Sequence, residues 1–77
     1  MSPKTDVKLN IGSRLHVLRA EKRLTQEELA QAVGVTRATI IAIEKGNYNP
    51  SLELAFRLAR HFQTDIQNVF FIEGETP

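Results

Sequence analysis

Cysteine is missing from the 77 residues of this chain, and no apolar run approaches the length of a signal peptide or of a membrane span. A chain without cysteine forms no disulfide and no thiolate metal site, which agrees with a reducing compartment. The N-terminal residues MSPKTDVK are polar. From these features we expect a soluble, cytoplasmic protein that does not bind a membrane.

Side chains that carry catalysis are also scarce. Histidine occurs only at His16 and His61, without the H-x-x-x-H or H-E-x-x-H spacing of a metal site, and there is no glycine-rich phosphate loop. Cysteine nucleophiles are absent, and the acidic residues fall at expected caps and on solvated helix surfaces. The sequence therefore predicts no enzyme activity, no catalytic residue, no metal site and no cofactor.

Charge is nearly balanced, with 10 basic and 9 acidic residues and a formal net charge of +1. A protein that binds nucleic acid is usually more basic, so the sum argues weakly against that function. The distribution matters more, because six basic residues lie between positions 14 and 45 and three acidic ones lie near the end of the chain. These residues are Arg14, Arg19, Lys22, Arg23, Arg37 and Lys45, and then Asp65, Glu73 and Glu75. A weakly basic first half can still bind phosphate groups.

The sequence does contain a dense set of helix signals between Thr25 and Asn47. Thr25 and Glu28 have the spacing of a capping box, in which each side chain accepts a hydrogen bond from a backbone N–H at a helix start. Gly34 follows the apolar residues of this helix, and glycine adopts the left-handed conformation that ends a helix without strain. Thr36 can cap a second helix. The stretch predicts two short helices joined by a tight turn.

The second of these helices should cross the first closely, because Ala30 offers no bulk where they meet. Ile40 and Ile43 form an apolar stripe at i, i+3, which we expect to be buried. The opposite side then faces outward, and it carries Arg37, Ala38, Ile41 and Lys45. The pattern predicts a helix that is presented for contact.

A helix is expected over about residues 11–22, with Asn10 as its N-cap. The alternation of Val7, Leu9 and Ile11 could instead make a short strand, and a frayed terminus with Ile11 already in the core is an equal alternative.

Two helices follow the central pair. Ser51 caps one that ends at about His61 or Phe62. Thr64 and Gln67 have the T-x-x-Q spacing of a box that starts a short last helix. A chain of this length supports one domain, and we place it at residues 10–70, after a flexible arm at residues 1–9 and before a tail at residues 71–77.

Small, turn and apolar residues at fixed offsets resemble the lambda-repressor-like (Xre-type) helix-turn-helix family over about residues 11–70. The residues that carry this resemblance are Gln26, Ala30, Gly34, Val35, Thr36, Ile40, Ile43, Glu44-Lys45-Gly46-Asn47 and Tyr48-Asn49-Pro50-Ser51. The resemblance implies an all-α fold, a compact five-helix DNA-binding domain. The sequence also leaves open a short C-terminal strand, which would be used in dimerisation.

In such a domain the helix at about residues 36–45 lies in the major groove of double-stranded DNA. Arg37 could donate two hydrogen bonds to guanine, whereas the small or apolar Ala38, Ile41 and Ala42 could contact thymine methyl groups. Family members usually carry polar residues at several of these positions. The expected phosphate contacts are Gln26, Thr36, Thr39, Lys45, Asn47, Tyr48 and Asn49.

The resemblance also implies a structural ion pair between Arg19 and Glu44, which would fix the recognition helix to the first helix. At the other end of the chain, Phe70, Phe71 and Ile72 belong to a run of four apolar residues that cannot all face one small core. We expect Phe71 or Ile72 to be exposed and the cluster to form a homodimer interface. It would pair as a strand with its two-fold mate or with Val7–Leu9.

The expected function is therefore a sequence-specific DNA-binding transcriptional regulator, a repressor that acts as a homodimer. The alternative is a protein-interaction or antitoxin-like module whose main partner is another protein of unknown identity. The low net charge and the apolar recognition face favour the alternative slightly.

Overall fold

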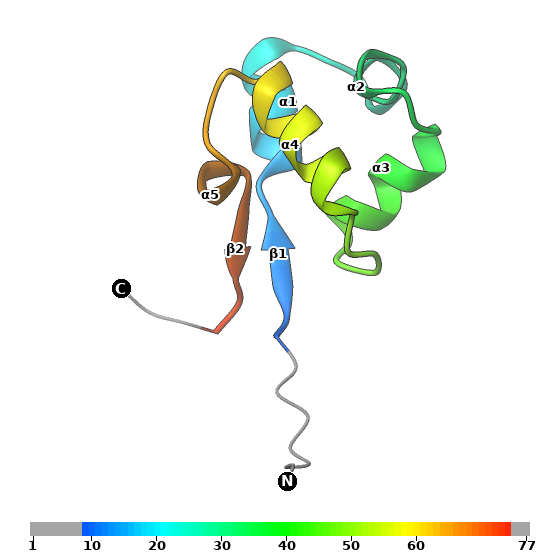
Figure 1. The fold of residues 1–77 in the computed structure, drawn as a ribbon. Helices are drawn as coiled ribbons and strands as arrows, with labels where there is room; N and C mark the ends of the chain where they lie inside the picture. The colour runs from blue at the N-terminus through cyan, green and yellow to red at the C-terminus, as the bar shows by residue number, and fades with distance from the viewer. Residues whose placement is uncertain (1–8, 75–77) are drawn as a thin grey trace, which may run out of the picture.

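The computed structural model describes residues 9–74, which form five helices and two short strands (Figure 1). In chain order they are β1 (Ile11–Ser13), α1 (Leu15–Lys22), α2 (Gln26–Val33), α3 (Arg37–Glu44), α4 (Leu52–His61), α5 (Ile66–Val69) and β2 (Phe70–Ile72). The predicted five-helix domain is confirmed, with a two-stranded antiparallel sheet added to it. The predicted arm covers residues 1–9, and residues 1–8 of it lie outside the described part of the chain.

The core draws on all five helices, because each turns its apolar side inward. The fully or almost fully buried side chains are Leu15, Leu29, Ala30, Val33, Ile40, Ile43, Leu54, Ala55, Leu58, Ala59, Phe62 and Val69. In the described part of the chain no polar or charged residue is buried among them. Burial of this apolar area is the main stabilising term of the fold. No helix among the described residues is long and apolar enough to cross a membrane.

The first helix begins at Leu15, so the prediction that it starts at Ile11 with Asn10 as its cap was wrong. Ile11 lies in strand β1 instead. Directly before α1, the backbone N–H of Arg14 donates a hydrogen bond to the carbonyl of Val69, at 2.8 Å. The residues before α1 therefore satisfy their backbone groups by pairing with the far end of the chain, which the local pattern did not show.

Strand β1 pairs with β2 in antiparallel register, with Ile11 opposite Ile72 and Gly12 opposite Phe71 (Figure 1). The partner of β2 is thus Ile11–Ser13 of the same chain, whereas the sequence suggested its two-fold mate or Val7–Leu9, of which residues 7 and 8 lie outside the described part of the chain. The close approach leaves little room at Gly12, where a Cβ atom would lie 2.6 Å from the Phe71 ring.

The last helix also differs from its prediction. It covers only Ile66–Val69, its N-cap is Asp65, and no side chain caps it. The Thr64 hydroxyl accepts a hydrogen bond of 2.8 Å from the side-chain amide of Asn68. Thr64 and Gln67 therefore do not form the expected box, because the helix starts too late for Thr64 to stand at its N-cap.

Candidate nucleic-acid interface

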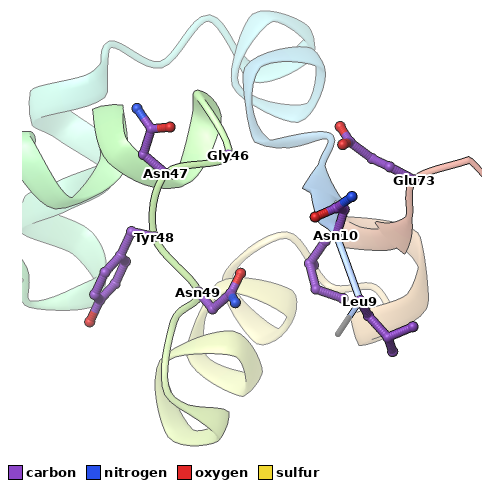
Figure 2. Close-up of a pocket in the computed structure, with 8 residues that line it drawn as sticks. Leu9, Asn10, Gly46, Asn47, Tyr48, Asn49 and Glu73 are labelled. Atoms are coloured by element: carbon purple, nitrogen blue, oxygen red, sulfur yellow. The ribbon is translucent and has the colours of Figure 1, made fainter. Parts of the chain in front are cut away.

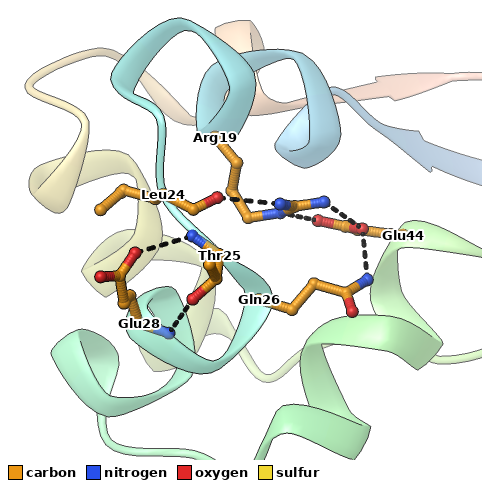
Figure 3. Close-up of polar contacts among 6 residues, drawn as sticks. All are labelled: Arg19, Leu24, Thr25, Gln26, Glu28 and Glu44. Carbon is orange, nitrogen blue, oxygen red and sulfur yellow. Dashed lines mark hydrogen bonds and ion pairs between the residues drawn. The ribbon is translucent and has the colours of Figure 1, made fainter.

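Helix α2 begins and ends where its sequence signals stand. The Thr25 hydroxyl accepts a hydrogen bond from the Glu28 N–H at 3.0 Å, and the Glu28 carboxylate accepts one from the Thr25 N–H at 2.9 Å (Figure 3). The predicted capping box is confirmed. Gly34 ends the helix at φ = 79°, in the left-handed region that glycine favours. An additional contact comes from Arg57, which donates to the Val33 carbonyl.

Helix α3 packs against α2 and β1. The Thr36 hydroxyl caps it by accepting a hydrogen bond of 3.2 Å from the Thr39 N–H. Ile40 is fully buried and Ile43 is 2% exposed. The predicted burial of this stripe is confirmed, and it fixes which side of α3 faces away from the protein.

The four residues predicted to contact bases differ in exposure. Arg37 and Ala38 are exposed, whereas Ile41 and Ala42 are half-buried. Among the described residues, Arg37 has no ion-pair partner. Its guanidinium is therefore free to meet a ligand at the N-terminal end of α3.

Arg19 and Glu44 form the ion pair that the resemblance implied, and it joins α1 to α3 (Figure 3). The Arg19 guanidinium donates two hydrogen bonds to the Glu44 carboxylate, at 2.7 and 3.1 Å, and a third to the Leu24 carbonyl at 2.9 Å. The exposed fractions of the two side chains are only 18% and 9%. Two-point pairing with a guanidinium fixes the orientation of both groups.

The electrostatics of this pair favour its charged form. Hydrogen bonding to Glu44 raises the pKa of Arg19 above its ordinary value, although burial acts in the opposite direction. Burial raises the pKa of the Glu44 carboxyl. Hydrogen bonds from Arg19 and Gln26 lower it, as do the charges of Arg19 and His16, and together they hold the pKa below its ordinary value. Glu44 therefore stabilises the fold as a carboxylate.

Gln26 is a member of this network that the sequence did not reveal. Its side-chain N–H donates a hydrogen bond of 3.0 Å to the Glu44 carboxylate, so the amide is held between α2 and α3 (Figure 3). A carboxamide nitrogen carries two N–H groups. One is used by Glu44, and the second remains for a further acceptor.

The turn after α3 carries the other predicted phosphate contacts. Gly46 has φ = 79°, and the N–H groups of Gly46 and Asn47 donate to the carbonyls of Ile43 and Ala42 at 3.0 and 2.9 Å. Because backbone bonds hold this turn, the side chains of Asn47, Tyr48 and Asn49 are exposed and available.

A depression lies beside this turn, opposite the start of β1 (Figure 2). It is lined by Leu9, Asn10, Ile11, Gly46, Asn47, Tyr48, Asn49 and Glu73. The remaining predicted phosphate contacts lie on α3 itself or at its end. Lys45 is exposed, and the Thr36 and Thr39 hydroxyls lie 3.1 Å apart.

Residues 15–68 match the helix-turn-helix family (HTH_3). The chain belongs to this family. As the resemblance to lambda-repressor-like proteins implied, it is a DNA-binding transcriptional regulator. The family is not enzymatic, which agrees with the prediction of no enzyme activity.

Three similar proteins illustrate the family. The chain is 51% identical over 63 residues to an HTH-type transcriptional regulator of Methanocaldococcus jannaschii, which covers 82% of this chain and 96% of the relative. It is 41% identical over 55 residues to the cryptic phage CTXphi transcriptional repressor RstR of Vibrio cholerae. This match covers 71% of this chain and 50% of the repressor. The restriction-modification controller protein C.AhdI from Aeromonas hydrophila has a similar structure, with a TM-score of 0.66 and 34% sequence identity. The match covers 71% of this chain and 80% of C.AhdI.

The apolar C-terminal run of this helix-turn-helix regulator is only partly covered. Phe70 packs at the edge of the core, Ile72 is half-buried, and Phe71 is 40% exposed. The prediction that Phe71 or Ile72 is exposed is therefore confirmed. The Arg14 guanidinium lies 5.9 Å from the centre of the Phe71 ring, within the range of a cation–π contact.

Proposed function

We propose that this protein is a sequence-specific repressor that binds double-stranded DNA as a homodimer and inserts α3 into the major groove. The observation that carries the proposal is the division of α3 into two sides. Ile40 and Ile43 lie in the core, and Arg37 and Ala38 are exposed at the N-terminal end of the helix. In helix-turn-helix proteins, that end of the second helix contacts the edges of the bases.

Sequence selectivity would then depend mainly on Arg37. A guanidinium that donates to O6 and N7 of guanine contributes roughly 1–3 kcal/mol of discrimination against other bases. Ala38 and the half-buried Ile41 and Ala42 offer only apolar surface, which suits thymine methyl groups. We therefore expect one strongly specified base pair in each half-site, next to weaker preferences.

Phosphate contacts would come from both sides of the groove. The second side-chain N–H of Gln26 would donate to a DNA phosphate at the start of α2, where the helix dipole also favours an anion. The Thr36 and Thr39 hydroxyls, Lys45 and the exposed turn after α3 would hold the other side. That turn supplies Asn47, Tyr48 and Asn49. Such contacts position the protein and add little specificity.

A homodimer would place two copies of α3 on half-sites roughly 34–36 Å apart, one turn of DNA. The partly exposed Phe70, Phe71 and Ile72 are the proposed interface, since β2 uses only one of its two edges to pair with β1. Repression by occupying a promoter is supported by the relative that is a phage repressor. Sedimentation of the isolated chain as a monomer well above micromolar concentration would remove the dimer from this proposal.

The decisive experiment selects bound sites from a random duplex pool and then measures affinity for them by fluorescence anisotropy. Arg37→Ala should relax the preference at one base pair in each half-site and weaken binding to the selected site by roughly 1–3 kcal/mol, with an unchanged melting temperature. Arg60→Ala, which removes an exposed arginine from α4, is the matched control and should bind as the wild type.

Two results would contradict the proposal. An unchanged site preference in Arg37→Ala would remove Arg37 from base recognition. Absence of any binding to duplex DNA at about 50 mM salt, where phosphate contacts should be strong, would favour the protein-interaction module instead.

A further inference from the structure

A shallow depression lies where α1, α2 and α3 meet, and each helix supplies part of its wall. His16 comes from α1 and Gln26 from α2, and α3 contributes Ile41, Glu44 and Lys45. His16 is exposed, and its imidazole makes no ion pair or side-chain hydrogen bond to any other described residue. The core and the polar network therefore do not account for this side chain.

The depression opens on the side that the proposed function assigns to DNA. Gln26 and Lys45, two of the proposed phosphate contacts, line it, and so does Ile41, a proposed base contact. A DNA strand that touches both Gln26 and Lys45 must pass over the space between them. The imidazole of His16 borders that same space from the α1 side.

Glu44 would by itself repel a phosphate at this place. Its carboxylate is already occupied by two hydrogen bonds from Arg19 and one from Gln26, so most of its charge is compensated within the protein. His16 and Glu44 line the same depression, so the imidazole lies on the side of the space that holds this carboxylate. A donor beside the carboxylate would make the depression more favourable for an anion.

We propose that His16 is an additional phosphate contact, through which α1 binds the DNA backbone between Gln26 and Lys45. The assignment rests on the proposed function, because it requires that α3 lies in the major groove. An imidazole donates an N–H to a phosphate oxygen in either protonation state. The contact is independent of sequence, so it adds affinity and not selectivity.

The test measures binding of the full chain to random-sequence duplex DNA by fluorescence anisotropy over a range of salt concentrations. His16→Ala should weaken binding about tenfold, the lower end of the effect of one lost hydrogen bond to a charged group such as a phosphate. His16→Glu should weaken it further. His16→Lys should restore it, and its dependence of log K on log salt should be steeper than that of His16→Ala by about 0.9, as expected for one phosphate neutralised by a lysine.

His61→Ala is the matched control, because His61 is also exposed but lies on α4 and borders a different depression. It should bind as the wild type. Melting temperatures of all variants separate a loss of contact from a loss of folding, and rescue by His16→Lys identifies a contact even if His16→Ala melts earlier.

The outcomes distinguish this inference from the proposed function. A wild-type chain that does not bind duplex DNA overturns both. Wild-type binding with no change in His16→Ala overturns the phosphate contact alone. Weak binding by both His16→Ala and His16→Lys also overturns it, because a structural role would then explain the loss.

Discussion

The α2–α3 pair and the β1–β2 sheet are held in place by different kinds of interaction. In the helix pair, each helix is capped by its own residues, and one network of side chains, Arg19, Gln26 and Glu44, then joins the pair to α1. In the sheet, backbone groups from opposite ends of the chain pair directly. The position of the proposed DNA-binding side of α3 thus depends on a few polar side chains in addition to its buried stripe of Ile40 and Ile43, whereas the sheet depends on close backbone approach.

The difference predicts which substitutions are most costly. A side-chain network can lose one member and leave a partly buried charge without its partner. A backbone pairing tolerates most side chains, but not added bulk where the strands and their side chains meet. The experiments below separate these two mechanisms, beginning with the largest expected effect.

Glu44→Ala should have the largest effect. It leaves the Arg19 guanidinium, of which only 18% of the side-chain surface is exposed, with the Leu24 carbonyl as its remaining partner. Because loss of one partner leaves a poorly solvated charge, we expect the free energy of unfolding to fall by about 2–4 kcal/mol. Chemical denaturation monitored by circular dichroism measures this loss.

The chain provides a matched control in its exposed ion pair. Arg57 and Glu53 are 3.9 Å apart, and their side chains are 45% and 81% exposed. Glu53→Ala should therefore cost less than about 1 kcal/mol, including the lost interaction with the start of α4. Equal effects of Glu44→Ala and Glu53→Ala would show that the network contributes nothing beyond an ordinary surface pair.

Gly12→Ala tests the sheet. The added methyl group would lie 2.6 Å from the Phe71 ring, so the ring or the strand must move. Overpacking of a core costs about 1–3 kcal/mol, and because the Phe71 ring is 40% exposed and can turn aside, we expect the lower end, about 1 kcal/mol. In the background of Phe71→Ala the same substitution should cost much less, because the ring is gone. If Gly12→Ala is equally costly in both backgrounds, the Phe71 ring is not the cause.

The same difference explains what the sequence could predict. The capping box of Thr25 and Glu28, the left-handed Gly34 and the cap at Thr36 each depend on residues within one or two turns, so the local pattern contains the whole signal. The buried stripe of Ile40 and Ile43 was predictable for the same reason. These features determine the helix pair and the outward side of α3.

The errors occurred where the partner is distant in the chain. The residues before α1 became a strand because β2 and the Val69 carbonyl satisfy their backbone groups. No pattern within residues 10–15 encodes that partner. The hydrogen bond between Gln26 and Glu44 was missed for a related reason, since it needs the crossing of α2 and α3 as well as the side-chain types. The Arg57 contact with the Val33 carbonyl is another example.

The last and smallest effect concerns the pH dependence of the network. The pKa of Glu44 is lowered in the folded protein, so the folded state holds its proton less tightly than the unfolded state does. Its contribution is fully present above the ordinary pKa of glutamate, about 4.3, and is lost as the pH falls through the lower pKa of the folded protein.

Glu44→Gln has nearly the same shape but does not titrate. The difference in unfolding free energy between wild type and Glu44→Gln should be constant near neutral pH and should shrink below about pH 4.3. The other carboxyl groups titrate in both proteins and cancel in this difference. A difference that stays the same in acid would mean that the charge of Glu44 does not stabilise the position of α3, and that shape and hydrogen bonding alone hold the helix.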